Sequence, residues 1–328
     1  MVSICCLTYN HGKYIRKALE SFVNQITNFK YEILIHDDCS TDNTVEIIKE
    51  FEERYPELIK PIYQEENQHS KGICITYTYQ FPRVKGKYIA MCEGDDYWTD
   101  SNKLQLQFEA MEMNLDCSFC THIVQHINES GDLLNKFQPN MNRLLSFNEG
   151  IIQSSYIFEN VFYENNIPFQ TSSYFFRKDD IVDYLNSFQK EIARINSFGD
   201  ICIVWYLLTK GNCYYFNKIM SNYRENSICS WSNKFKNNSF RLRFYEELKC
   251  FFNKFNTYTN KKYDNLINTK IKKCEFIIYE IKKDYNAMIQ KKYKIFLNNY
   301  SFKHRMLIYL CARISYLTNF FTIKGRKK

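Results

Sequence analysis

Glycine and proline are scarce in this sequence, with nine Gly and five Pro among 328 residues. Hydrophobic residues make up 45% of the chain and aromatic residues 17%, which is ample for a packed core. This composition excludes a chain that is disordered throughout, because such chains contain too few apolar residues to fold. The length predicts one large domain with an appendage, or two domains.

We also expect no secretory leader and no disulfide framework. Residues 1–7 already form an apolar run typical of a strand, and the thirteen cysteines are an odd number scattered mostly through apolar segments. We therefore expect reduced thiols and a cytoplasmic location. Cys117 and Cys120 form a C-x-x-C pair, but no second Cys or His pair stands at zinc-site spacing. Two buried thiols in a strand are favoured over a redox or structural role.

A balance of charge is missing as well, although the overall net charge is only +8. Residues 233–328 contain 23 Lys and Arg against 6 Asp and Glu, whereas residues 1–232 contain 21 against 30. An acidic body excludes a protein that wraps nucleic acid with its main domain. The basic C-terminal region points to a polyanion, either an anionic membrane surface or nucleic acid.

What the sequence does contain is an acidic cluster directly after an apolar run, within residues 88–98 (YIAMCEGDDYW). The run at residues 88–92 has no polar alternation, which predicts a strand buried on both faces. Glu93, Asp95 and Asp96 follow it around a glycine. Ligands bind at the carboxyl ends of such strands, and crowded carboxylates suit Mg²⁺ or Mn²⁺ with a phosphate-bearing substrate. The alternative is a solvated acidic turn.

Strands and helices alternate along the first hundred residues. We predict strands at residues 1–7, 31–36, 59–63 and 88–92, and helices at residues 13–24, 44–55 and 72–84. This alternation predicts an α/β fold, with a Rossmann-like, mostly parallel sheet and helices on both faces. Asp37 and Asp38 end the second strand, so two acidic strand ends meet at one sheet edge. The first could bind a nucleobase or ribose, and the second a metal under a diphosphate.

Three segments carry a resemblance to a known family. They are VSICCLTYNHGKYIRKALESFVNQ, YEILIHDDCSTDNT and KGKYIAMCEGDDYW. In this order and spacing, the sequence resembles a family 2 glycosyltransferase with a GT-A-type fold. The resemblance is close over residues 1–125 and looser to about residue 232. It implies an enzyme that transfers a sugar, with inversion and with a metal, from a nucleotide diphosphate to an acceptor hydroxyl.

The resemblance also implies roles for residues in the nucleotide-binding half, residues 1–125. Thr8, Tyr9 and Asn10 would line the base pocket, and Asp38 would contact the uracil or other base with Asp37 beside it. Lys71 lies where the family often has a basic loop near the donor. Lys71 would approach phosphate there, and a surface lysine is the favoured alternative.

The metal site that the resemblance implies is the acidic cluster. Glu93-Gly94-Asp95 stands in the place of the family's Asp-x-Asp motif, with Glu in place of the first Asp. Asp95 would bridge Mn²⁺ or Mg²⁺ and the diphosphate, while Glu93 or Asp96 would contact ribose or metal. The longer Glu side chain leaves the division of roles between these acids open.

Residues 126–232 would form the acceptor half, with a loop at residues 129–147 and a strand at residues 167–177. Asp200 precedes an apolar helix where the family often has its general base, and the alternative is a helix N-cap. The chemistry requires such a base, because an acceptor hydroxyl is a poor nucleophile. Arg224 would clamp the diphosphate, or form a structural salt bridge.

From residue 233 to residue 328 we predict basic, amphipathic helices. The last, residues 302–323, contains Arg313, Ser315, Thr318 and Asn319, so it is a poor transmembrane span. It fits a helix lying in the plane of an anionic membrane surface, on the inner face of the plasma membrane. The alternative is a helix that packs back on the catalytic domain.

The leading prediction of function is a bacterial glycosyltransferase that builds a surface polysaccharide or a lipid-linked glycan. We expect a UDP-sugar donor, a glycan or lipid-linked acceptor, and no nucleic-acid partner. The alternative is a non-catalytic nucleotide-binding module that uses its basic tail to bind a partner.

Overall fold

The computed structural model describes residues 1–139, 148–162, 169–192, 199–225 and 234–325 of the chain. The chain forms two compact units, Met1–Asn233 and Lys234–Lys328. The first unit combines a sheet with helices, and the described part of the second consists of helices.

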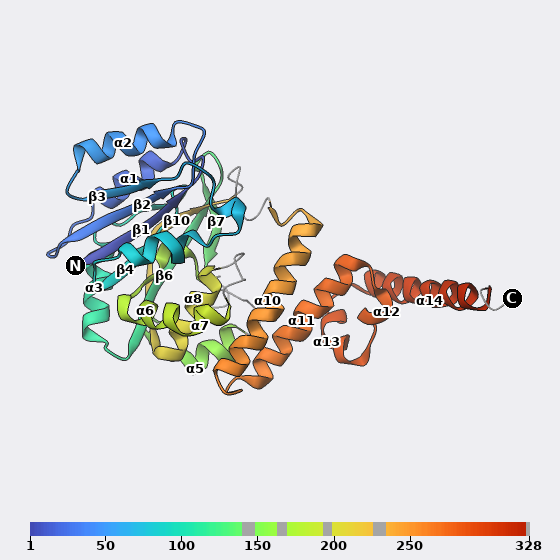
Figure 1. Cartoon of the computed structure of the whole chain (residues 1–328). Helices are drawn as coiled ribbons and strands as arrows, with labels where there is room; N and C mark the ends of the chain where they lie inside the picture. The colour runs from blue at the N-terminus through green and yellow to red at the C-terminus, as the bar shows by residue number, and fades with distance from the viewer. Residues whose placement is uncertain (140–147, 163–168, 193–198, 226–233, 326–328) are drawn as a thin grey trace. The chain divides into compact units, whose positions relative to one another are not determined.

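Four parallel strands form one half of the sheet in the first unit. They are β1 (Val2–Thr8), β2 (Tyr31–Asp37), β3 (Ile59–Tyr63) and β4 (Tyr88–Met91), in the spatial order β3-β2-β1-β4. Val2 pairs with Tyr31 of β2 and with Tyr88 of β4. These strands run side by side, so their carboxyl ends lie at one edge of the sheet (Figure 1). The four predicted strands and the two predicted helices between the first three of them are confirmed.

The other half of the sheet mixes directions. β9 (Phe175–Arg177) runs antiparallel between β4 and β6 (Cys117–Ile127), and β10 (Asn212–Arg224) runs parallel to β6. The remaining strands, β5 (Tyr97–Trp98), β7 (Leu133–Gln138) and β8 (Gly150–Ile152), each pair antiparallel with β10 or β6. The predicted α/β class is therefore confirmed, with parallel pairing among β1 to β4 and between β6 and β10.

Helices cover the sheet on both sides. α1 (Ile15–Val23) and α2 (Thr44–Arg54) lie on one side, and α6 (Lys178–Asn186) and α8 (Gly199–Lys210) lie on the other (Figure 1). Within the described ranges of this unit, the other α-helices are α3 (Lys103–Met113) and two short ones, α5 (Ser154–Tyr156) and α7 (Phe188–Glu191). α1 buries Ile15, Ala18, Leu19 and Phe22, because apolar residues recur at helical spacing on one side.

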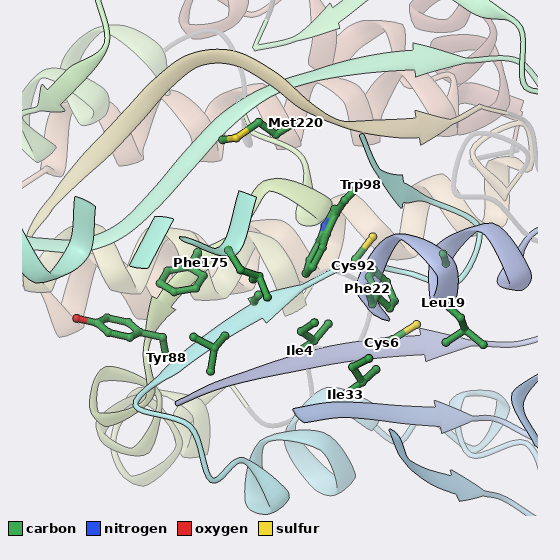
Figure 2. Close-up of a cluster of buried hydrophobic side chains, with 14 of the residues drawn as sticks. Ile4, Cys6, Leu19, Phe22, Ile33, Tyr88, Cys92, Trp98, Phe175 and Met220 are labelled. Carbon is green, nitrogen blue, oxygen red and sulfur yellow. The ribbon is translucent and has the colours of Figure 1, made fainter. Parts of the chain in front are cut away.

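The main core of the first unit lies between α1 and the strands. Figure 2 shows Ile4 and Cys6 of β1, Ile33 of β2 and Phe22 of α1 grouped together, with Tyr88 of β4 at the other end of the same cluster. These five side chains have no solvent exposure. The core therefore fixes β1, β2 and β4 relative to one another, and with them the loops that follow their carboxyl ends.

Three predicted elements differ from the structure. The helix predicted at residues 72–84 is replaced by short turns: η1 (His69–Lys71), η2 (Thr76–Gln80), a π-helical turn, and η3 (Phe81–Arg83), a 3₁₀ turn. A proline in the first turn of η3 interrupts any continuous helix there, because it lacks an N–H donor. The loop predicted at residues 129–147 contains strand β7, and its residues 140–147 lie outside the described residues.

The strand predicted at residues 167–177 is also largely wrong. Thr171–Ser173 form a 3₁₀ turn, η5, and only Phe175–Arg177 pair as a strand. The hydroxyl of Thr121 is 2.6 Å from that of Ser173, and Ser172 is bonded similarly to Ser221 at 2.9 Å. The small polar side chains therefore bond across to β6 and β10. Residues 167 and 168 lie outside the described residues.

The second unit consists of helices around an aromatic core. They are α10 (Asn238–Tyr258), α11 (Asp264–Lys282), α12 (Tyr285–Met288), α13 (Lys294–Leu297) and α14 (Phe302–Gly325). The amphipathic pattern is confirmed for α10, which buries Phe244, Leu248, Phe251, Phe252 and Phe255. Across the residues that the structure describes, no helix is both long and apolar enough to cross a bilayer.

Candidate active site

The loop after β1 is tied to the loop after β2. The N–H of Asn10 donates to Ser40 Oγ at 2.8 Å, and Asn10 Oδ1 accepts the N–H of Thr41 at 2.8 Å. Asn10 has a φ of 55°, a left-handed conformation that asparagine tolerates better than most residues. Thr8 is 3% exposed, and no partner for its hydroxyl is found among the described residues. These hydrogen bonds thus fix the segment Thr8–Asn10 beside the end of β2.

Asp37, paired in register with Thr8, stabilises the turn after β2. Its carboxylate accepts the N–H of Ser40 at 2.9 Å and the Ser40 hydroxyl at 2.5 Å. Burial raises the pKa of Asp37, although the hydrogen bonds from Ser40 oppose that rise. Both oxygens of this carboxylate are therefore used within the turn.

Asp38 reaches the short loop that contains η1. One oxygen of its carboxylate accepts the N–H of Gln68 at 2.7 Å, and the other accepts the N–H of His69 at 3.1 Å. His36 lies behind it, with Nε2 3.9 Å from Asp38 Oδ1. Burial lowers the pKa of His36 to about 4, which outweighs the attraction of Asp38, so the imidazole is neutral at pH 7. Two backbone amides thus balance the Asp38 charge.

Lys71 belongs to η1 but turns to a nearby carboxylate. Its Nζ forms an ion pair with Glu66, and both side chains are largely exposed. An exposed pair of this kind contributes little to stability and leaves the ammonium group able to exchange partners. The approach of Lys71 to a phosphate stays a prediction.

The acidic turn after β4 is held against the end of β1. The N–H of Gly94 donates to Leu7 O at 2.8 Å, and a Cβ at Gly94 would lie 2.8 Å from Thr8 Oγ1. Only glycine fits this close approach. The N–H of Asp96 donates to Glu93 O at 3.1 Å and closes the turn. Glu93, Asp95 and Asp96 are thereby brought to the same sheet edge as Thr8 and the two acids of β2.

Arg224, at the end of β10, holds this turn from the other side. Its backbone N–H donates to Asp96 Oδ1 at 2.8 Å, and its Nε donates to Asp95 O at 3.1 Å. Its Nη1 donates to the carbonyls of Asn128 and Glu129, at 3.1 and 2.8 Å. Arg224 is 5% exposed, so it has a structural role through carbonyl oxygens rather than a salt bridge. Its contact with a diphosphate stays a prediction.

The cluster is strongly negative. Burial raises the pKa of Asp96 well above its usual range, and the charges of Asp95 and Glu93 raise it further. The pKa of the Tyr223 phenol is raised by burial and then by the same acids, so this ring also lies beside them. His11 Nε2 is 3.8 Å from Asp95 Oδ2. A cation bound beside Glu93, Asp95 and Asp96 would relieve the repulsion between their carboxylates.

The donor chemistry fits a hard divalent cation. Carboxylate oxygens are the ligands that Mg²⁺ and Mn²⁺ prefer. Within the described ranges, no three His, Cys, Asp or Glu side chains form a group that could hold a metal ion by themselves. Mg²⁺ is commonly held by one or two carboxylates together with substrate phosphates. Asp95 and Glu93 therefore fit a metal that is completed by the phosphates of a ligand, while Asp96 already accepts the N–H of Arg224.

Asp200 lies in the first turn of α8, as predicted. Its Oδ1 accepts the N–H of Ile201 at 2.9 Å, and Tyr77 fixes this turn by donating to Gly199 O at 2.9 Å. Loss of water around the carboxyl group raises the pKa of Asp200, against the hydrogen bonds that it accepts. Burial raises the pKa of the Tyr174 phenol, and the charges of Asp200 and Glu93 raise it further. The Tyr174 phenol therefore lies within electrostatic range of both carboxylates.

Three further side chains lie at this edge, His11, Tyr223 and His126, and the sequence predicts no role for any of them. The structure places His126 Nδ1 2.6 Å from Glu225 Oε1, with the ring of His126 5.1 Å from that of Tyr223. The position of His11 directly after Asn10 was a usable signal, whereas the partners of His126 are about a hundred residues away in the chain.

The first 185 residues match a known family. The model for Glycosyl transferase family 2 covers residues 3–185. An uncharacterized Mycobacterium tuberculosis protein, Rv1520, is 40% identical over 138 residues, 42% of this chain and 39% of the relative. The putative teichuronic acid biosynthesis glycosyltransferase TuaG of Bacillus subtilis is 33% identical over 137 residues, 42% of this chain and 52% of the relative. These matches span only about two fifths to a half of each relative's length.

Solved structures share the fold. S. aureus TarS 1–349 in complex with UDP-GlcNAc aligns with a TM-score of 0.58 at 17% identity, over 90% of this chain and 78% of that chain. The mannosyltransferase PcManGT from Pyrobaculum calidifontis, in complex with GDP-Man and Mn²⁺, aligns with a TM-score of 0.51 at 11% identity, over 96% and 86%. At this identity the likeness shows the fold, and it confirms the predicted GT-A type.

Proposed function

Because the chain belongs to glycosyl transferase family 2, we propose that this glycosyltransferase moves a sugar from a nucleoside-diphosphate sugar to an acceptor hydroxyl. The observation that carries the proposal is the meeting of two acidic strand ends beside β1. Register and backbone hydrogen bonds bring Asp38, directly after the second strand, and Asp95, after the fourth strand, to either side of Thr8. The loops after β1 and β2 could then bind the base, and the turn after β4 could bind the diphosphate.

The donor half of the proposal uses the loops after β1 and β2. Thr8, Tyr9 and Asn10 would line the base, with Asp38 accepting hydrogen bonds from it and Asp37 fixing the turn. A UDP-sugar is favoured, and the structural relatives that carry UDP-GlcNAc and GDP-Man support a nucleotide-sugar donor. The assignment of residues 1–125 to the donor and 126–232 to the acceptor rests on this arrangement.

Asp95 and Glu93 would hold Mn²⁺ or Mg²⁺ together with the diphosphate. When bound, the metal neutralises the charge of the leaving nucleoside diphosphate. The Mn²⁺ in the PcManGT structure supports this choice of ion. The chain's own contribution is the geometry of the turn, which Gly94 and Arg224 keep against β1 and β10.

Asp200 would act as the general base. Its raised pKa favours uptake of a proton, and the first turn of α8 holds the carboxylate in place through Ile201 N–H. A base must lie within hydrogen-bond reach of the attacking hydroxyl as the hydroxyl loses its proton. A single base opposite the leaving group gives transfer with inversion at the sugar carbon.

The acceptor would be a glycan or a lipid-linked sugar in cell-surface polysaccharide synthesis. Support comes from the similarity to TuaG, whose name places it in teichuronic acid biosynthesis. A cytoplasmic location fits a donor of this class, because nucleotide sugars are made inside the cell. Acceptor and location both stay proposals.

The first experiment is a thermal-shift titration with UDP and with GDP, each with and without Mn²⁺. A ligand that binds only the folded protein raises its apparent stability. We expect a Mn²⁺-dependent shift with UDP that is lost in Asp95→Asn. Glu53→Gln is the matched control, because Glu53 is an exposed carboxylate on α2.

Two outcomes would contradict the proposal. No shift with any nucleotide would exclude a nucleotide-sugar donor. A shift with UDP, without release of UDP from any UDP-sugar offered with acceptors, would favour the non-catalytic nucleotide-binding module.

A further inference from the structure

The last helix, α14 (Phe302–Gly325), presents two different sides. Ile308 is 6% exposed and Ala312 is 1% exposed, and Ile308 packs in a core cluster with Phe276 and Met288. The other large apolar side chains described on this helix are between 46% and 70% exposed: Phe302, Met306, Leu307, Tyr309, Leu310 and Ile314. α14 therefore has an inner side that belongs to the unit and an outer side that is apolar and largely exposed.

The exposed side chains follow one side of the helix. Residues three and four apart lie on the same face, which places Phe302, Met306 and Leu310 in one row and Leu307 and Ile314 in the next. We call these five exposed side chains, with Tyr309 as the sixth, the outer face of α14. In α10 of the same unit the corresponding large residues are buried instead. An apolar stripe of this size on a surface marks a place of contact.

The charges around the outer face all have one sign. From residue 285 to residue 328 the sequence contains ten Lys and Arg and neither Asp nor Glu. Lys303 and Arg313 are exposed on α14 among the apolar residues. Long basic side chains cover apolar surface with their stems while their charged ends reach outward. A partner for this face must accept apolar side chains and carry negative charge nearby.

We infer that the outer face of α14 lies in the surface of a membrane that contains anionic lipids. An in-plane helix buries its apolar side at the boundary of headgroups and acyl chains, while its basic residues meet anionic headgroups. A second copy of this chain is a poorer match, because it would bring two basic helices together. The inference does not depend on the proposed sugar transfer, since lipid binding is measured without a donor.

The test is vesicle flotation of the full chain at low and at high salt. Vesicles made of phosphatidylcholine and phosphatidylglycerol in equal parts are compared with phosphatidylcholine alone. We expect binding to the anionic vesicles that weakens with salt. Leu307→Glu with Leu310→Glu should weaken it at least about tenfold, because two apolar side chains that enter the lipid are lost and two negative charges are gained.

The matched control carries the same change elsewhere. Met113→Glu with Leu115→Glu replaces two residues that are 78% and 75% exposed in the first unit. It should bind vesicles as the unchanged protein does. Lys303→Gln with Arg313→Gln keeps the apolar face and should weaken binding several-fold at low salt only.

Three outcomes would overturn the inference. In the first, the unchanged protein floats with neither kind of vesicle, which excludes a membrane surface. Equal binding by the Leu307 and Leu310 variant would place the lipid contact elsewhere. A dimer in solution that this variant dissociates, without vesicle binding, would assign the outer face to a second copy of the chain.

Discussion

The two units of this protein place charge in opposite ways. The first unit buries carboxylates at one sheet edge, where Asp38 and Asp96 are each 2% exposed and are held by backbone amides. The second unit has a core of phenylalanine side chains on α10 and keeps nearly all of its excess positive charge outside. Buried charge is costly unless it is bonded, so its presence marks the unit that carries chemistry.

The buried lysine side chains allow a second comparison between the two units. Among the side chains that the structure describes, each unit contains one buried lysine, Lys103 in the first and Lys270 in the second, and burial lowers the pKa of each to about 7. Lys103 donates to Gln107 Oε1 at 2.6 Å and lies over the ring of Trp98. Burial of a cation therefore does not distinguish the two units. The buried acidic cluster of the first unit distinguishes them more clearly.

The largest expected effect is on the acid that we assign as the base. Asp200→Asn should lower kcat by about 10²–10⁴-fold, because the amide cannot take the acceptor proton. In the unchanged protein kcat should rise with pH as Asp200 loses its proton, at a pH above the usual range for aspartate because its pKa is raised. The variant should lose this rise. Transfer to an acceptor, measured across pH, checks both statements.

The control for that variant is Asp180→Asn on α6. Burial raises the pKa of Asp180 as well, so it is a matched carboxylate away from the acidic cluster. It should retain transfer. Unchanged UDP-dependent thermal shift in Asp200→Asn would separate a lost base from a lost fold, and full activity in Asp200→Asn would remove the assignment.

The next effect sharpens the comparison through stability. Leu248→Ala on α10 should destabilise the second unit by about 2–5 kcal/mol, since Leu248 has no exposure. Leu19→Ala on α1 should do the same to the first unit. All three tryptophans precede residue 234, so their fluorescence reports on the first unit, while far-ultraviolet circular dichroism reports on both.

Urea unfolding followed by both signals distinguishes the two cases. In Leu248→Ala the fluorescence transition should stay in place while part of the dichroism moves to lower urea. A single transition that shifts equally in either variant would show that the units unfold as one, and the comparison would then concern charge alone.

A smaller effect concerns pH. The pKa of Lys270 is about 7 when folded and near its usual 10.5 when unfolded, so between these values the unfolded chain binds more protons. The stability of the second unit should therefore rise with pH, by about 1.4 kcal/mol per pH unit. Lys270→Met should flatten this rise. Urea midpoints at pH 7 and pH 9 measure it, with the exposed Lys272→Met as control.

The smallest effect concerns the outside of the second unit. Lys282 Nζ is 3.1 Å from Glu246 Oε1, and both side chains are about half exposed. Lys282→Ala should change the unfolding free energy by roughly 0.2–1 kcal/mol. Glu275→Gln should cost more, because Glu275 is 19% exposed and accepts from both Lys249 and Tyr293. Equal costs for the two variants would contradict this ranking.

Much of the sheet could be predicted from sequence because β1, β2 and β4 are buried along nearly their whole length. Their apolar runs stand out in the sequence, and the predicted bounds of residues 59–63 agree with the half-buried edge strand β3. The acidic strand ends followed from those strands. Asp37, Asp38 and the residue 93–96 turn therefore could be placed at one edge before the structure was known.

The remaining parts depend on contacts between distant residues. β7 escaped prediction because most of its side chains are exposed or half-buried, so it has no regular apolar pattern. The carbonyl partners of Arg224 belong to Asp95, Asn128 and Glu129, and main-chain partners leave no trace in sequence. The pairing of His126 with Glu225 likewise required the register of β6 with β10.

The bond from Asp38 to the loop around η1 has a consequence for how that loop exchanges its amide protons. The N–H groups of Gln68 and His69 end on the same carboxylate that we propose for the nucleobase. A nucleobase that donates a hydrogen bond to an oxygen of Asp38 either competes with one of those two amides or reduces the mobility of both. Hydrogen–deuterium exchange at residues 68 and 69 would then respond to nucleotide, although neither residue is proposed to touch it. Amide exchange in this loop would therefore report nucleotide binding at the site.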